Sequence, residues 1–335
     1  MSRSLVLLIL FFFCTAYDAA AENMEVTPFR SVNQNPLVSI YGIPAESSAT
    51  IIPSKKLMVS LTQEIANSFI YDSNDRERIV LAGESYRWTV AARYGFGDKF
   101  EAGIEIPYIL YGGGFLDNFI VEWHKAFGFR QWGRDIDPKN RLRFVYIKDR
   151  VWKLNMNHAG SGVGDVTLTG GMQIYDAVSK ESHDSLALRG GVKLPSGNSS
   201  YLQGSGSTDF VLHFCGGTTR FTRWGAIGAY GSVGALAMTR GDVLPDQHNP
   251  LAGVGTLGLG WSPASWISFK VQLNGNTPLY RKSSLDELSM GSLMLISGGA
   301  IKLPGEYLLD IGVAEDVAVA TAPDITLHLG LSKKF

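Results

Sequence analysis

The feature that most constrains the fold of this chain is the alternation of apolar and polar residues in segments of about ten residues. The clearest segment is WISFKVQLN, where Ile267, Phe269, Val271 and Leu273 share one face and Ser268, Lys270, Gln272 and Asn274 share the other. A period of two is that of an extended strand whose two faces meet different surroundings. No apolar run beyond the N-terminus reaches the roughly 20 residues that a membrane helix needs. The chain is therefore predicted to be all-β.

The same alternation indicates about 12 strands. We expect them at residues 57–67, 84–94, 99–110, 163–176, 184–194, 207–217, 223–238, 250–261, 265–275, 287–299, 305–315 and 324–335. The connections after even-numbered strands are short, and most of those after odd-numbered strands are longer, as in barrels of the bacterial outer membrane. We predict a transmembrane antiparallel β-barrel with both termini periplasmic and the long loops extracellular. An exported soluble β-sandwich is the alternative.

The N-terminus predicts export. Arg3 precedes an apolar stretch, and Ala19 and Ala21 have the spacing of a signal-peptidase site, so residues 1–21 are interpreted as a signal peptide. Cleavage would remove Cys14 and leave Cys215 alone, which excludes an internal disulfide in a single barrel domain of residues 22–335. The formal net charge of −1 gives no basic field for nucleic acid.

The insertion at residues 113–150 is predicted to be a long extracellular loop with a short helix. Apolar residues recur at helical spacing, Asp117 lies near the start and Gly128 is placed to end the helix. The apolar positions, which would form a plug or gate, are Leu116, Ile120, Trp123 and Phe127. Such a helix folds into the lumen, caps its mouth, or packs on the barrel rim. The arginines that follow, Arg130, Arg134, Arg141 and Arg143, either bind outer-leaflet lipopolysaccharide phosphates or pair with nearby aspartates.

Strand parity assigns a set of charged residues to the lumen. They are Arg87, Arg93, Glu101, Glu105, Arg189, Lys193, Lys270, Asp310 and His328. Such charges line a wet pore or pair across it and close it. A barrel of about 12 strands leaves at most a narrow path. On parity alone, Leu329→Arg on the lipid face is expected to destabilise the barrel, and Thr326→Arg on the lumen face is expected to be tolerated.

Several stretches together resemble a known family. They are YGFGDKFEAGIEIPYI, GGGFLDNFIVEWHKAFGFRQWGRDIDPKNRLRF, SGVGDVTL, GGVKLPSG, LQGSGSTDFVL and GVAEDVAVATAPDITLHLGLSKKF. The chain resembles a Gram-negative outer-membrane β-barrel family catalogued only as a domain of unknown function (family 3187), and is distantly similar to the phenol-degradation-pathway transporter barrels. The resemblance implies fold and location, and it supplies no substrate or site.

The last strand also resembles the C-terminal signal by which the barrel-assembly machinery recognises its clients. Leu331 and Phe335 carry that resemblance, whereas Lys333 stands where an aromatic residue is often found. The expected partners are this machinery, outer-membrane lipid with lipopolysaccharide, and an unknown small solute.

The sequence therefore predicts a passive channel or facilitator for small solutes, with a charged lumen gated by the long loop. The alternatives are an outer-membrane lipid-modifying enzyme and a closed structural or ligand-binding barrel. For an enzyme, the candidate pairs are Glu122 with His124 and Glu315 with Asp316, but neither spacing is diagnostic. No catalytic residue, metal site or cofactor is assigned.

Overall fold

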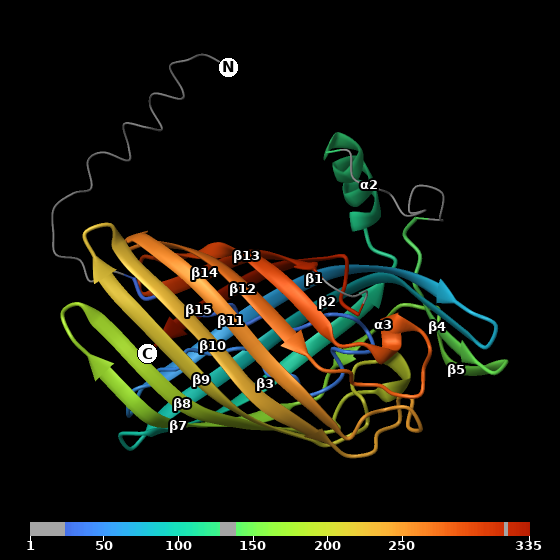
Figure 1. Cartoon of the computed structure of the whole chain (residues 1–335), viewed down its shortest axis with the longest axis horizontal. Coiled ribbons are helices and arrows are strands. Elements are labelled where there is room, and N and C mark those ends of the chain that lie inside the picture. The colour runs from blue at the N-terminus through green and yellow to red at the C-terminus, as the bar shows by residue number, and fades with distance from the viewer. Residues whose placement is uncertain (1–23, 128–138, 318–320) are drawn as a thin grey trace, which may run out of the picture.

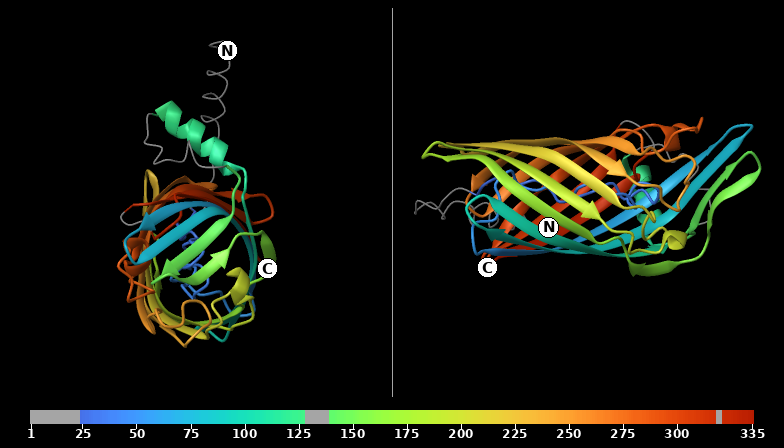
Figure 2. Two further views of the ribbon diagram at one scale, coloured as in Figure 1. Left: turned by 90° about the vertical axis from the view of Figure 1, so that its right-hand side faces the viewer. Right: turned by 90° about the horizontal axis from the view of Figure 1, so that it is seen from below.

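The computed structural model describes residues 24–127, 139–317 and 321–335. Twelve antiparallel strands form a closed barrel, which confirms the predicted fold class (Figures 1 and 2). They are β1 (Leu57–Ser73), β2 (Glu77–Phe96), β3 (Phe100–Gly112), β7 (Thr167–Val178), β8 (Ser182–Lys193), β9 (Asp209–Thr222), β10 (Gly225–Met238), β11 (Leu251–Ala264), β12 (Ile267–Asn276), β13 (Ser292–Leu303), β14 (Tyr307–Asp316) and β15 (Ile325–Lys334). The seam joins β1 to β15, from Met58 opposite Lys334 to Asn67 opposite Ile325.

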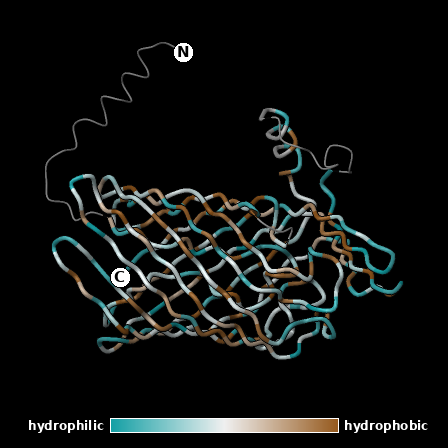
Figure 3. The backbone as a smooth tube through the Cα atoms, viewed as in Figure 1, coloured by the Kyte–Doolittle hydropathy of each residue, from teal (hydrophilic) through white to brown (hydrophobic). Residues whose placement is uncertain are grey.

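Each strand presents an apolar outer face and a polar inner face, as the alternation predicted. On the outside, Leu257 is 63% exposed, whereas the inward-facing Lys270 on the neighbouring strand is 2% exposed. Figure 3 shows apolar residues recurring along the strands over the whole wall. Aromatic residues, among them Trp224, Trp261 and Phe335, are exposed at the end with the short turns. An apolar band with aromatic residues at its edge is the surface that a bilayer requires.

The insertion after β3 forms more regular structure than the sequence indicated. β4 (Arg143–Lys148) pairs with the far end of β2, and β5 (Val151–Met156) pairs with β4. β6 (Gly160–Val163) pairs with the end of β3. The pairing with β4 explains why β2 begins at Glu77, earlier than expected, because its hydrogen bonding continues beyond the rim of the barrel. The remaining elements are short: η1 (Ser199–Tyr201) and α3 (Asp286–Ser289) lie in the long loops.

The predicted helix is present as α2 (Leu116–Phe127), but it does not enter the lumen. It leaves the long-loop end of the barrel and projects away from the wall in both views (Figures 1 and 2). Its first turn is held at the rim, because Glu84 accepts the backbone N–H of Leu116 at 2.6 Å and Asn67 donates to Asp117 at 3.0 Å. The side chains of Ile120, Trp123 and Phe127 lie outside the described residues, as do Arg130 and Arg134. No helix in the described ranges is long and apolar enough to cross a membrane.

Candidate functional site

The barrel interior is occupied by residues 24–56, which we call the lumen segment (Figure 2, blue). At the short-turn end, Glu25 lies 3.5 Å from His183. The chain then runs through the barrel to a turn at residues 36–40, where the Leu37 carbonyl accepts from the Tyr280 hydroxyl at 2.8 Å in a long loop. It returns to the short-turn end, where Ser54 bridges to Gly95 before β1 begins. The lumen segment is therefore a hairpin-shaped loop that fills the barrel along its length.

The composition of the lumen segment explains why it is neither helix nor strand. Pro28, Pro36, Pro44 and Pro53 lack backbone donors and recur every eight or nine residues, which interrupts both helices and ladders. The turn is made by local polar contacts. Asn33 accepts the backbone N–H of Asn35 at 2.8 Å, and Asn35 accepts that of Leu37 at 2.9 Å. Side chains of this kind replace the backbone pairing that proline removes.

Two glutamines on nearly opposite walls hold the backbone of the lumen segment. On β12, Gln272 accepts the backbone N–H of Phe29 at 2.8 Å and donates to its carbonyl at 3.1 Å. On β7, Gln173 accepts the backbone N–H of Ile51 at 2.8 Å and donates to the Ala49 carbonyl at 2.9 Å. The wall thereby supplies paired donors and acceptors to a chain that has no ladder of its own.

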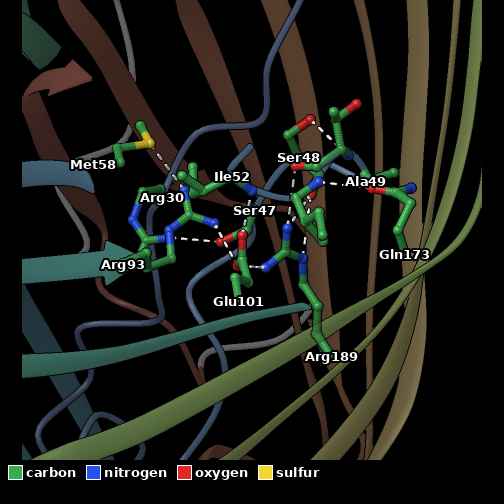
Figure 4. Close-up of polar contacts among 12 residues, drawn as sticks. Arg30, Ser47, Ser48, Ala49, Ile52, Met58, Arg93, Glu101, Gln173 and Arg189 are labelled. Carbon is green, nitrogen blue, oxygen red and sulfur yellow. Dashed lines mark hydrogen bonds and ion pairs between the residues drawn. The ribbon is translucent and has the colours of Figure 1, made fainter. Parts of the chain in front are cut away.

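A buried cluster of charged side chains on strands β2, β3 and β8 contacts the lumen segment (Figure 4). Glu101 on β3 accepts from Arg189 on β8 and lies 3.3 Å from Arg93 on β2. The same carboxylate accepts the backbone N–H of Ile52 at 2.7 Å, and Arg189 donates to the Ser48 carbonyl at 2.7 Å. Two cations thus share one anion. The other donors of Arg189 are directed to the lumen segment, whereas Arg93 also donates to the Met58 sulfur of β1 at 3.3 Å.

The other residues assigned to the lumen by parity also face inward and are paired. Glu105 binds Arg30 of the lumen segment, and Arg87 donates to the Ser39 carbonyl at 3.1 Å. Lys270 pairs with Asp310 and lies 4.0 Å from the centre of the Phe29 ring, which also meets the His328 ring edge-on.

The remaining lysine pairs near the long-loop end of the wall. Lys193 binds Asp165 and lies 3.3 Å from Asp209. Asp209 in turn accepts the backbone N–H of Gly42 at 2.8 Å. The structure therefore brings every one of the charges assigned to the lumen into contact with the lumen segment or with another wall residue.

Close packing at the short-turn end requires glycine in the wall. Val26 lies against Gly228 of β10 and Gly260 of β11. An added Cβ at these positions would approach the Val26 side chain to 2.9 and 2.3 Å. Because the second distance is far below van der Waals contact, Gly260 permits the lumen segment to enter beside β11.

At the long-loop end the contacts are apolar. Leu37, Ile40 and Tyr41 from the turn of the lumen segment are buried against the long loops. The partners include Leu202, Val243, Leu244, Leu279, Tyr280, Leu285 and Leu288. Burial of this apolar surface stabilises the turn by the hydrophobic effect. This apolar cap closes the end of the barrel opposite the termini.

Several cavities lie beside the lumen segment, and two of them bear on a path through the barrel. One, of about 80 Å³, lies at mid-height, and a larger one of about 250 Å³ opens toward the short-turn end. Both are lined by Arg30, Ser47, Thr62 and Arg93. The two cavities are therefore neighbours, separated by side chains that line both.

The C-terminal residues lie on the outer surface. Leu331 and Phe335 are exposed, and Lys333 places its ammonium 4.4 Å from the centre of the Tyr307 ring and 5.1 Å from that of Phe335. At the position where the assembly signal often has an aromatic residue, Lys333 therefore packs against two aromatic rings. In α2, Glu122 pairs with Lys125 at 2.9 Å on an exposed face, and the side chain of His124 lies outside the described residues.

A closed 12-stranded barrel with an apolar exterior and a polar interior defines a transmembrane β-barrel of the bacterial outer-membrane class. The chain belongs to the DUF3187 family, described as "protein of unknown function", whose model matches residues 4–335. No curated protein matches it.

Several solved structures are similar to this chain. The COG4313 outer membrane channel from Pseudomonas putida F1 aligns with a TM-score of 0.53 and 12% identity, over 85% of this chain and 97% of the channel. The translocator domain of the autotransporter NalP from Neisseria meningitidis gives 0.38 and 8%, over 85% and 90%. The Ralstonia pickettii toluene transporter TbuX gives 0.35 and 8%, over 84% and 89%.

Proposed function

We propose that the protein is a passive outer-membrane channel for small polar solutes, closed in this conformation by the lumen segment. The observation that carries the proposal is the chemistry of the contacts below the apolar cap. Residues 24–34 and 42–56 are held by hydrogen bonds and ion pairs to Gln173, Gln272, Glu101 and Arg189. Water can replace such contacts, so each one contributes little net to the closed state: about 1 kcal/mol for a bond to a glutamine, and about 1.5–3 kcal/mol for a bond to Glu101 or Arg189.

The proposed gate is the lumen segment and not α2. In this conformation α2 projects outside the barrel, whereas the lumen segment fills it (Figure 2). With the short turns in the periplasm, the lumen segment extends outward from that side and its turn meets the extracellular loops. Release of the turn from the apolar cap and of residues 42–56 from the wall would join the two cavities into one path.

The charges around the path favour anionic solutes. The mid-height cavity is lined by five cationic side chains, Arg30, Arg87, Arg93, Arg189 and Lys193. Three carboxylates, Glu64, Glu105 and Asp165, line the same cavity. A pore whose walls carry an excess of one charge concentrates ions of the opposite charge. We therefore propose a preference for small anions over cations.

The test is the conductance of refolded protein of residues 22–335 in a planar bilayer. Two variants are compared with it: a truncation that begins at Pro53, and a barrel in which a short Gly-Ser linker replaces residues 115–139. This replacement keeps β4, whose pairing with β2 a longer deletion would destroy. Circular dichroism and heat-modifiable gel mobility establish that each barrel is folded.

We expect the truncated barrel to conduct continuously. Anion preference is measured on openings of the intact protein, from the reversal potential in a salt gradient, because the truncation removes Arg30 from the cavity lining. The loop variant should behave as the intact protein does. A folded truncated barrel without conductance would contradict the channel and favour the closed barrel that the apolar cap suggests. Conductance that appears only in the loop variant would instead assign the gate to α2.

A further inference from the structure

Three side chains with metal-binding atoms meet where the lumen segment passes β9. Glu46 belongs to the lumen segment, and His213 and Cys215 occupy alternate inward-facing positions of β9. One ligand atom from each residue lies within 4.8 Å of those of the other two. Their exposed fractions are 3%, 5% and 1%. The cluster is therefore enclosed between the lumen segment and the wall.

The hydrogen bonding of the cluster is incomplete. Glu46 accepts from the Ser232 hydroxyl and from the backbone N–H of Ser47, the latter at 3.1 Å. His213 Nδ1 is buried and has no hydrogen-bond partner among the residues that the structure describes. A buried polar atom without a partner destabilises the folded state. An imidazole nitrogen held in this way beside a thiol and a carboxylate is suited to a cation.

The wall is shaped to hold these side chains. Strand geometry places His213 and Cys215 on the same face, about 6.6 Å apart along β9. On the neighbouring strand β10, Gly234 lies opposite His213 and Ser232 lies opposite Cys215. A Cβ at Gly234 would come within 2.3 Å of the His213 Cβ. Glycine at this position therefore makes the space that the histidine occupies.

We propose that Glu46, His213 and Cys215 bind one late first-row divalent cation, with Zn²⁺ the best match, and so link the lumen segment to the barrel wall. Thiolate, imidazole and carboxylate are the ligands that zinc takes in proteins, and three of them leave a fourth position for water. The Cys215 thiol gives up its proton to solvent when the metal–sulfur bond forms, so affinity rises with pH. The positive charge of Arg189 interacts electrostatically with both His213 and Cys215 and would oppose a bound cation. Its ion pair with Glu101 offsets this charge.

The position of the ligands predicts what the metal does. Two ligands belong to the wall and one to the lumen segment, so the complete site exists only while the lumen segment is seated. Metal binding raises the ratio of closed to open barrels by a factor of 1 + [M]/Kd, about 100-fold at 100 times Kd. This effect on transport rests on the proposed channel function, whereas the metal site itself does not.

Binding is measured by titrating refolded residues 22–335 with Co²⁺, whose absorption reports thiolate coordination, and with Zn²⁺ by calorimetry. The test variants are Cys215→Ser, His213→Gln and Glu46→Gln. The matched controls are His248→Gln and Glu77→Gln, a buried histidine and a buried carboxylate that lie in the long-loop region, away from the lumen segment. Each variant is first shown to be folded by its heat-modifiable gel mobility.

We expect one metal per barrel with a thiolate-to-cobalt band, which Cys215→Ser abolishes. The His213 and Glu46 variants should weaken binding at least tenfold, and the controls should not. No band in the folded protein, or equal binding by Cys215→Ser, would overturn the site.

A second measurement tests the link to the lumen segment. Hydrogen exchange of residues 43–52 should slow when Zn²⁺ is added to the intact barrel, and not in Cys215→Ser. Unchanged exchange with bound metal would refute the link. Because neither readout requires conductance, a barrel that binds metal but passes no ions would refute only the channel.

Discussion

Replacing Gln173 by Ala is expected to shift the barrel toward its open state. In the closed state, Gln173 accepts the Ile51 N–H at 2.8 Å and donates to the Ala49 carbonyl at 2.9 Å. The carbonyls of Tyr175 and Leu186 in the wall also lie within hydrogen-bond distance of its amide nitrogen, and they share its two hydrogens with the Ala49 carbonyl. The wall contacts are present whether or not the lumen segment is seated, so their loss cancels between the two states. Only the two contacts with the lumen segment change the balance.

The magnitude follows from those two hydrogen bonds. At about 1 kcal/mol net for each, the closed state loses about 2 kcal/mol relative to the open state. Since 1.4 kcal/mol is a factor of ten, the ratio of open to closed barrels should rise roughly 30-fold. Gln272→Ala removes the equivalent pair of contacts with Phe29 from β12. Because the two glutamines share no partner, the double variant should be additive, at roughly 1000-fold.

The assay is the open fraction in single-channel recordings, together with hydrogen exchange of residues 49–52. Gln247→Ala is the matched control, because this buried glutamine donates to the Tyr146 hydroxyl at 2.9 Å in the loop region. If Gln173→Ala and Gln247→Ala give the same open fraction and the same exchange, the polar contacts of the lumen segment do not set the closed state. That result would refute the reasoning.

Two further predictions test other parts of the molecule. Leu329→Arg on the lipid face should cost about 2–4 kcal/mol if it lies near the midplane, measured by urea unfolding in lipid, and an undiminished stability would contradict the assigned face. Burial, with a further contribution from Asp72, raises the pKa of Glu287 in α3 to about 7. The Glu287 carboxyl therefore favours the folded loop fully below pH 4.5, its ordinary pKa, and loses this contribution as pH rises through about 7. Glu287→Gln should abolish this pH dependence in hydrogen exchange of residues 283–290, corrected for intrinsic rates, and an unchanged pH profile would count against it.

The wall of the barrel could be predicted from the sequence because its chemistry is local. Each strand meets lipid on one face, so residues such as Leu257 and Lys270 reveal their sides by parity alone. The inward-facing charges could be listed for the same reason. Their partners could not be predicted, because strand parity tells only which face a side chain is on and not which other side chains lie near it.

The contents of the lumen could not be predicted in this way. Residues 24–56 have no periodicity, and their one signal is the regular recurrence of proline among buried amides such as Asn33 and Gln34. The filled interior also changes an expectation. Parity alone predicts that Thr326→Arg is tolerated on the lumen face, but Thr326 is fully buried, so the larger side chain should destabilise the barrel. The Glu46–His213–Cys215 cluster could not be predicted, because Glu46 is remote in sequence from the other two and His213 and Cys215 alone are no metal signature.

The hairpin path of the lumen segment has a topological consequence. Both of its limbs pass through the same rim, near His183 and near Gly95, so the segment is inserted as a loop and is not threaded from one end to the other. Its insertion or withdrawal along the barrel axis would require no break in the seam between β1 and β15. The wall can therefore close first and receive its occupant afterwards, and the occupant can leave and return without any strand being unpaired.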